Sequence, residues 1–491
     1  MKLVYRKITD WPKLAWVAVC PDKSHTLEIL HGPCVEVSDS WCVEAVWAGP
    51  FALGGFDLTD LVFGTGIRVR DSEVVFVSSG SPMDRLFYCK DKGKWFFSNS
   101  FPAMLAVSGL TLLDNYCYES DLESIKNGLN RYVKTIPLKH GQTSLVYFNN
   151  LVFDGSVIRE IGKPDSAWDF SNFDDYFDYL KSAAERLGEN LRASERSQQV
   201  IPFAPISSGY DSPVGAILAR QAGCCHSATI TSAEAVLLRR ADSGEAIAKR
   251  LNLECHVHKR TTTKFEHEEY VWAVMGNPSD LNLTVFDYPE PLTLLFTGFF
   301  GDKVWSCDFH LPLEKEPMIG MDLTGTRLSE FRLLKGIFHC PVPFWGIGHI
   351  GAIRKITSSA EMEPYRLHID YDRPIPRRII ESAGVPRGSF AIRKSATSLG
   401  KFVRCPASRK ARESFREYAR SLGTPLPNDC IIKALELVNG IDQLLLIRLR
   451  TQIRKRKGRC QWLRVGGQPK ASSLVFHWAI HETTRQYQAG L

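Results

Sequence analysis

Residues 207–212 combine small polar side chains with one carboxylate, a set suited to holding a phosphate through a metal ion. The segment reads Ser-Ser-Gly-Tyr-Asp-Ser, and Pro213 follows it at the start of a stretch with helical periodicity. A turn of small residues that leads into a helix presents free backbone N–H groups and the positive end of the helix dipole to an anion. Asp211 is itself an anion, so its presence makes chemical sense when a metal ion lies between it and the phosphate. The alternative, an ordinary strand–turn–helix connection, does not explain the carboxylate.

The elements around this turn predict a parallel sheet with helices on its faces. From about residue 200, short apolar runs alternate with stretches of helical periodicity. Strand-like runs lie at 200–206, 227–232 and 254–258, with helical stretches at 214–221 and 244–251. Such alternation is typical of βα units, and ligands of these sheets bind at the carboxyl ends of the strands. We therefore expect the turn at 207–212 to lie at such an end.

The residues before this region have a different pattern. Up to about residue 161, short β-like runs are separated by Gly, Asp and Asn, which predicts an antiparallel, β-rich domain. A linker at 162–165 leads to an amphipathic helix at 173–191, with Ser171 as its expected N-cap. We expect a β-rich domain at 1–165, an α/β domain at 166–410 and a helical, basic region at 411–491.

Composition restricts the class of protein. The 491 residues are 44% hydrophobic and 23% charged, which is typical of a folded, soluble chain. No apolar run approaches the length of a membrane span, and the amino terminus lacks the pattern of a signal peptide, so we expect a cytoplasmic protein without a membrane span. The 13 cysteines are an odd number without CxxC spacing, so the sequence indicates neither a disulfide framework nor a zinc site.

Residues 207–212 resemble the pyrophosphate loop, Ser-Gly-Gly-x-Asp-Ser, of asparagine synthetases and of β-lactam and carbapenam synthetases. Gly209, Asp211 and Ser212 stand at the matching places, whereas Ser208 replaces the first glycine. These enzymes are PP-loop ATP pyrophosphatases, so the resemblance implies an asparagine-synthetase-like ATP-pyrophosphatase domain. It also implies that five residues of the loop bind ATP: Ser207, Ser208, Gly209, Asp211 and Ser212.

Residues 294–302 resemble the second loop of this family, in which a strand ends in Ser/Thr-Gly and a later aspartate helps to hold Mg²⁺. Here the strand ends at Thr297 and Gly298, and the aspartate is Asp302. The resemblance implies that Gly298 lies at the ATP site and that Asp302 and Asp211 hold Mg²⁺ together. Two carboxylates from two strand ends, with room for triphosphate oxygens and waters, suit an octahedral Mg²⁺ site.

A third segment, residues 373–394, resembles the late segment that supplies a phosphate-binding lysine in family members. Lys394 matches this role, and Lys303 is a rival that would also lie at the ATP site. A cation there offsets the negative charge that accumulates on the α-phosphate and the leaving pyrophosphate. The resemblance thus implies three catalytic residues, Lys394, Asp211 and Asp302. The alternative for either lysine is a solvated surface charge.

Three further residues are assigned from their positions. Thr229 and Ile230 lie near the end of the second predicted strand, where related enzymes read adenine with backbone groups. Asp242 precedes the helical stretch at 244–251 and resembles an acidic element that lies near the nucleotide in the family. The preferred interpretation of Asp242 is the N-cap of that helix.

Residues 51–55, 84–88 and 94–100 resemble the glutaminase-like domain of asparagine synthetases, which has an Ntn-hydrolase fold. Active members attack glutamine with a cysteine that follows the initiator methionine, but this chain has Lys2 there, and its first cysteine is Cys20. Without a terminal thiol there is no nucleophile for amide hydrolysis. The resemblance therefore implies a degenerate glutaminase-like domain. The amine must then be free ammonia, an amine supplied by a separate protein, or part of the substrate.

Phe299 or Phe300 stands where relatives carry a Glu or Tyr that helps the amine to attack. Phenylalanine cannot move a proton, so a general base is expected elsewhere, and each candidate also has a structural interpretation. The candidates are Glu361, Glu363, Tyr365 and His368.

The resemblance implies an AMP-forming, ATP- and Mg²⁺-dependent ligase. Its substrate would be a carboxylate of a small molecule, glycan or peptide, which is adenylated with release of pyrophosphate before the acyl group passes to an amine or ammonia. One alternative is a PP-loop enzyme that modifies RNA, supported by eight Lys/Arg and no acid in residues 448–464. A solvated helix end explains this run more simply, so we do not expect a nucleic-acid partner. The other alternative is a non-catalytic ATP-binding relative, favoured by Ser208, Phe299 and Phe300. The sequence leaves a homodimer open.

Overall fold

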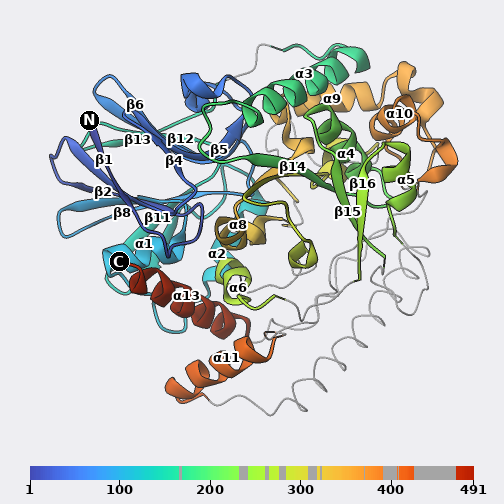
Figure 1. The fold of residues 1–491 in the computed structure, drawn as a ribbon. Coiled ribbons are helices and arrows are strands. Elements are labelled where there is room, and N and C mark those ends of the chain that lie inside the picture. The colour runs from blue at the N-terminus through green and yellow to red at the C-terminus, as the bar shows by residue number, and fades with distance from the viewer. Residues whose placement is uncertain are drawn as a thin grey trace.

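The structure is a computed structural model, shown in Figure 1. It describes residues 1–164, 168–231, 242–259, 265–275, 283–307, 318–320, 323, 325–369, 371–390, 406, 408–424 and 471–491. These residues form a β-rich amino-terminal region and a parallel sheet with helices. The mixed α/β class expected from the sequence is therefore confirmed.

Two sheets form the amino-terminal region. A seven-stranded sheet has the order β1-β3-β2-β9-β8-β11-β10, and a six-stranded sheet has the order β13-β12-β7-β6-β5-β4. The strands of the first are β1 (Lys2–Lys7), β2 (Trp16–Pro21), β3 (Thr26–His31), β8 (Leu86–Asp91), β9 (Lys94–Ser98), β10 (Thr135–Leu138) and β11 (Gly141–Val146). Those of the second are β4 (Glu36–Ser38), β5 (Trp41–Trp47), β6 (Val62–Arg70), β7 (Glu73–Val77), β12 (Asn150–Phe153) and β13 (Ile158–Ile161). Neighbouring strands are antiparallel, as expected, apart from β1 and β3.

Aromatic side chains fill the space between these two sheets. Because successive residues of a strand point to opposite faces, alternate residues of β2, β7 and β9 meet there. Phe76 of β7 stacks on Phe97 of β9 with ring centroids 3.9 Å apart, and the ring of Trp16 in β2 lies 6.4 Å from Phe76. The two sheets therefore pack face to face as a sandwich, at the left of Figure 1.

A five-stranded sheet follows, with the order β16-β15-β14-β17-β18 and parallel pairing throughout. Its strands are β14 (Val200–Pro205), β15 (His226–Ile230), β16 (Glu254–His258), β17 (Leu292–Thr297) and β18 (Ile337–Pro341). The expected strands at 200–206, 227–232 and 254–258 correspond to β14, β15 and β16. The parallel sheet predicted from the alternating pattern is confirmed.

Helices α3 (Phe173–Leu191) and α4 (Asp211–Gln221) contact each other, and α4 packs against β14 and β17. The N-cap of α3 is Asn172, whose side chain accepts a hydrogen bond from the Asp175 N–H at 3.0 Å. Ser171, the expected cap, stands one residue earlier, and its N–H donates to the Asp175 carboxylate. The other α-helices described are α1 (Phe101–Ser108), α2 (Tyr118–Leu122), α5 (Glu245–Arg250), α6 (Glu269–Met275), α7 (Gly301–Val304), α8 (Ser329–Lys335), α9 (Ile350–Thr357), α10 (Pro374–Ser382), α11 (Arg409–Ser421) and α13 (Ala471–Ala489).

Buried charges on α8 connect the parallel sheet to the sandwich. Arg332 donates to both oxygens of Glu44 at 2.8 and 3.0 Å and forms an ion pair with Asp84. On the same helix, the carboxyl of Glu330 accepts a hydrogen bond from the Ser100 hydroxyl at 2.8 Å. The largest apolar core cluster extends through both regions, and α13 packs on α1 and α6 (Figure 1). The two regions therefore meet over a buried and densely hydrogen-bonded contact.

The expected boundary at residues 165–166 and the basic run at 448–464 lie outside the described residues. Within the described part of the chain, no helix has both the length and the apolar character that crossing a bilayer demands.

Candidate functional site at the carboxyl ends of the parallel strands

The turn at 207–212 follows β14, the central strand of the parallel sheet, and leads directly into α4. Hydroxyl groups close this turn. The N–H of Ser207 donates to the Ser212 hydroxyl at 3.0 Å, and the two serine hydroxyl oxygens lie 2.8 Å apart. The N–H of Gly209 donates to the Ser207 hydroxyl at 3.3 Å. Two N–H groups that the sequence assigns to a phosphate therefore have serine partners in the structure.

Asp242 holds the other side of this turn. Its Oδ1 accepts hydrogen bonds from the N–H and the hydroxyl of Ser208, at 3.2 and 2.7 Å. Burial raises the pKa of Asp242, and the bonds from Ser208 oppose that rise. The N-cap of helix α5 is Gly244, which has no side chain to make a capping hydrogen bond. The N-cap interpretation of Asp242 is therefore wrong, because its carboxylate reaches the 207–212 turn instead.

The second loop packs directly on the first turn of α4. A Cβ placed at Gly298 would lie 2.3 Å from the carbonyl carbon of Asp211, closer than any side chain tolerates. A Cβ at Gly301 would lie 2.7 Å from the carboxyl carbon of Asp211. Asp302 is the next residue, in the first turn of α7. The structure thus brings the segment of Asp302 against the Asp211 carboxylate, from the ends of two neighbouring strands.

Arg373 pairs with Asp211 and is also affected by the charge of Asp302. Its guanidinium donates to Asp211 Oδ2 in an ion pair, in which the arginine side chain is 4% exposed and the aspartate side chain 22%. Burial lowers the pKa of Arg373, but the charges of Asp211, Tyr371 and Asp302 raise it, and the net direction is upward. One cation therefore interacts electrostatically with both predicted metal ligands.

Aromatic rings form a wall beside the turn. The rings of Tyr210 and Tyr371 lie 4.8 Å apart, and the Arg373 guanidinium carbon lies 4.7 Å from the Tyr371 ring. Arg377 donates to the Tyr210 hydroxyl at 2.7 Å. Burial raises the pKa of Tyr371, and the charge of Asp211 adds to this effect. Both tyrosines therefore stay neutral near pH 7 and position the turn through packing.

Phe300 is buried in the apolar interior, and the half-buried Phe299 packs against it. The Phe299 ring lies 5.3 Å from the ring of His339, and Phe300, with a φ of 74°, stacks on Phe344 at 5.1 Å. Burial, aided by the charge of Arg332, lowers the pKa of His339 to about 3, so this imidazole is neutral. Neither phenylalanine has a polar atom to offer a reacting amine.

The candidates for a general base have structural partners. Glu361 accepts a hydrogen bond from the N–H of Phe173, the first residue of α3, at 2.9 Å, and Arg378 also donates to it. Glu363 and His368 form an exposed pair at 2.8 Å. These contacts favour the structural interpretation that the sequence left open.

The remaining predicted residues have separate positions. Thr229 is buried near the end of β15, where its hydroxyl accepts a hydrogen bond from the Gly244 N–H at 2.9 Å, and Ile230 beside it is buried as well. Lys303 is half-buried in α7, beside Asp302 in the chain. Lys394 lies outside the described residues.

Sequence reasoning missed the role of Arg373, and for Asp242 it preferred the N-cap to the position near the nucleotide loop that it also considered. Pro374, in the first turn of α10, indicates where that helix starts, and Arg373 directly precedes it. No local pattern identifies Asp211 as the partner of this arginine, since the pair is formed by segments far apart in the chain.

No model of a known protein family matches the chain, and no curated protein sequence is significantly similar to it. The relationship to asparagine synthetases therefore stays a prediction from the residue pattern.

Proposed function

We propose that the protein is an ATP- and Mg²⁺-dependent ligase that adenylates a carboxylate and transfers the acyl group to an amine. One observation carries this proposal. The Asp211 carboxylate lies against Gly301, the residue before Asp302, and the charges of Asp211 and Asp302 both raise the pKa of Arg373, so acidic residues from two strand ends act on one arginine. An ordinary strand–turn–helix connection gives no reason for that arrangement. Ligands of parallel α/β sheets bind at this end of the strands, and paired carboxylates there suit a metal-bound phosphate.

The donor set fits Mg²⁺ and a triphosphate. Asp211 and Asp302 would hold the ion with carboxylate oxygens, and a bound ion would supply positive charge to the phosphate oxygens. Arg373 forms an ion pair with Asp211, and the charge of Asp302 also acts on it. If the ion were bound by these acids, the Arg373 guanidinium would be available to a phosphate oxygen, for which its planar set of N–H donors is well suited.

The 207–212 turn binds the pyrophosphate portion of ATP in this proposal. The N–H groups of Ser207 and Gly209 exchange their serine partners for phosphate oxygens, and the hydroxyls of Ser207 and Ser212 turn to the same oxygens. Because each lost hydrogen bond is replaced by one to a charged acceptor, the exchange is favourable. Asp242 keeps Ser208 in place during this exchange.

The reaction has two displacements. A carboxylate oxygen of the substrate attacks the α-phosphorus, the bond between the α-phosphorus and the bridging oxygen breaks, and pyrophosphate leaves with that electron pair. The amine nitrogen then attacks the acyl carbon, the bond to the AMP oxygen breaks, and the nitrogen loses a proton to solvent as the amide forms. Arg373 and Lys303 are described cations near the site that can stabilise the charge on the phosphates during the first step.

The amine comes from outside the amino-terminal region. Lys2 lies in the edge strand β1, and Cys20 is buried on β2. Burial, with a smaller contribution from Asp22, raises the pKa of the Cys20 thiol to about 11, so little thiolate forms at neutral pH. These features support an amine supplied as ammonia, as a group on the substrate, or by a separate protein.

Pyrophosphate release from ATP, measured with a panel of carboxylic acids with and without ammonium, tests the proposal. We expect release that requires one class of acid, and loss of that release in Asp211→Asn. Asp57→Asn is the matched control, because it removes a carboxylate paired with Arg70 in the sandwich, away from the site. Release that persists in Asp211→Asn, or the absence of release with every acid, would contradict the proposal.

A further inference from the structure

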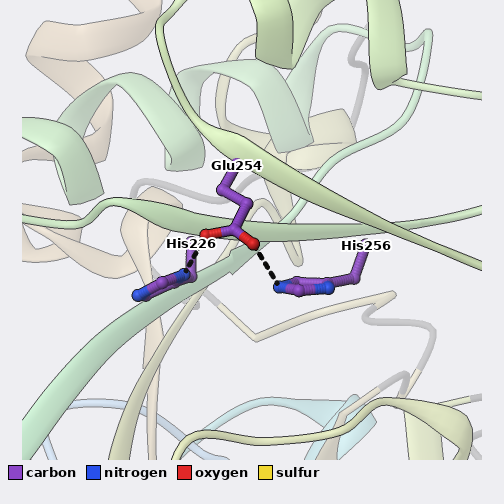
Figure 2. A group of neighbouring side chains, drawn as sticks. All are labelled: His226, Glu254 and His256. Carbon is purple, nitrogen blue, oxygen red and sulfur yellow. Dashed lines mark ion pairs between the residues drawn. The ribbon is translucent and has the colours of Figure 1, made fainter.

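Three exposed side chains on the outer part of the parallel sheet form a second polar group: His226, Glu254 and His256 (Figure 2). His226 Nδ1 lies 3.3 Å from one oxygen of Glu254, and His256 Nε2 lies 3.6 Å from the other. One ligand atom from each residue lies within 4.8 Å of the other two. Figure 2 shows both imidazoles directed toward the glutamate between them.

The strands place these residues without help from loops. His226 is the first residue of β15 and pairs in register with Glu254, the first residue of β16, while His256 pairs with Ala228. Because side chains alternate along a strand, Glu254 and His256 share one face, and His226 projects from the same face of the neighbouring strand. β16 is the edge strand, so the group is open to solvent. A ligand set built on paired strands requires little ordering when it binds an ion.

The chemistry of the three donors favours transition metals. Two imidazole nitrogens and one carboxylate oxygen are ligands typical of Zn²⁺ and its neighbours, whereas Mg²⁺ prefers oxygen. A tetrahedral ion with bonds of about 2.1 Å holds its ligand atoms about 3.4 Å apart, so the contacts of 3.3 and 3.6 Å already lie near that spacing, and rotation of the exposed side chains adjusts the wider separations. Exposed ion pairs contribute little to stability. The attraction of Glu254 for the two histidines therefore does not by itself explain why the three side chains lie together.

We propose that His226, Glu254 and His256 bind one divalent transition-metal ion, with Zn²⁺ as the best fit, and leave its remaining coordination positions to solvent. The ion connects β15 to the edge strand β16. This site is separate from the carboxyl-end site, because His226 and Ile230 lie at opposite ends of β15, about 13 Å apart along the strand. The sequence alone did not indicate it, since the set combines residues from two strands that only the fold brings together.

Calorimetric titration of the full-length, untagged and chelator-treated protein with Zn²⁺ tests this proposal. We expect one equivalent bound by these residues, and weakening by about tenfold or more in His226→Ala and in His256→Ala. Excess Mg²⁺ should leave the affinity unchanged. All three side chains are 42% to 63% exposed, so the variants should keep the fold, which circular dichroism verifies.

His481→Ala is the matched control. The His481 side chain is similarly exposed, at 48%, and its Nδ1 lies 3.1 Å from a Glu482 oxygen. The substitution therefore removes a His–Glu pair from α13, far from the proposed site in the chain. Cys225→Ser tests whether the exposed thiol of the residue before His226 contributes to Zn²⁺ binding. Both controls should bind Zn²⁺ as the wild type does. No binding by the wild type, equal affinity in His226→Ala and His256→Ala, or loss of binding in Cys225→Ser alone would overturn the proposal.

Discussion

Gly298 packs so closely against Asp211 that a Cβ at the glycine would lie 2.3 Å from the backbone carbonyl carbon of the aspartate. This contact joins the end of β17 to the first turn of α4. It also determines how near the loop that carries Asp302 comes to the Asp211 carboxylate. The proposed metal site therefore depends on a glycine that leaves space for this contact.

Gly298→Ala should separate the two loops. The added methyl group meets backbone atoms of Asp211, which cannot rotate away, so we expect a loss of about 1–3 kcal/mol in the free energy of unfolding. Denaturant titration measures this change, and pyrophosphate release should fall with it. Gly348→Ala is the control, since a Cβ there meets nothing within 4 Å. Equal stability of the two variants would show that the loops adjust freely.

Arg373→Ala should remove the positive charge that interacts with Asp211 and Asp302. Asp211 is partly exposed, so we expect the free energy of unfolding to fall by about 2 kcal/mol, less than for a fully buried ion pair. Asp211→Asn in the same protein should recover part of this loss, because the uncompensated charge disappears. Thermal unfolding measures both effects.

The same variant tests where Mg²⁺ binds. If Arg373 occupies an oxygen that the ion would use, Mg²⁺ should raise the melting temperature of Arg373→Ala more than that of the wild type. Arg409→Ala, which removes an arginine that is 88% exposed and paired with Glu413, is the control and should behave as the wild type. An identical Mg²⁺-induced rise of the melting temperature in all three proteins would show that Arg373 does not compete with the ion for Asp211.

Glu330 should give the contact between α8 and the sandwich a pH dependence. Burial raises the pKa of this carboxyl from 4.5 to about 7, although Ser100 and two arginines lower it. The folded state therefore binds the proton more tightly, so the stabilising contribution is complete below pH 4.5 and disappears as the pH rises through 7.

Glu330→Gln should remove that dependence. The stability of the wild type relative to this variant should fall by about 3 kcal/mol between pH 4 and 8, measured by urea unfolding at each pH. Glu413→Gln, on the exposed side of α11, should follow the wild type. Parallel pH profiles for the wild type and Glu330→Gln would mean that this carboxyl has an ordinary pKa in the folded protein.

Local patterns predicted much of the fold. Alternation of apolar and helical segments identified β14, β15 and β16, and the turn residues marked the point where β14 leads into α4. These features depend on neighbours in the chain, which periodicity and turn chemistry describe well.

The contacts of the site were less predictable. The ion pair of Arg373 with Asp211 and the bonds from Ser208 to Asp242 join segments that are distant in the chain and carry no shared period. The N-cap expected at Asp242 failed for this reason: a tertiary acceptor role outweighed the local preference. Likewise, the direction of Phe299 depends on its packing against His339, which comes from β18.

Diffraction from crystals grown with Mn²⁺ and a non-hydrolysable ATP analogue tests the central claim most directly, because Mn²⁺ replaces Mg²⁺ and scatters anomalously. The proposed function predicts an anomalous peak about 2.1–2.2 Å from carboxylate oxygens of both Asp211 and Asp302, with the phosphates against residues 207–212 and separate from any ion at His226, Glu254 and His256. A nucleotide bound with its metal ion away from these two carboxylates, or no nucleotide at the carboxyl ends of the parallel strands, would contradict it.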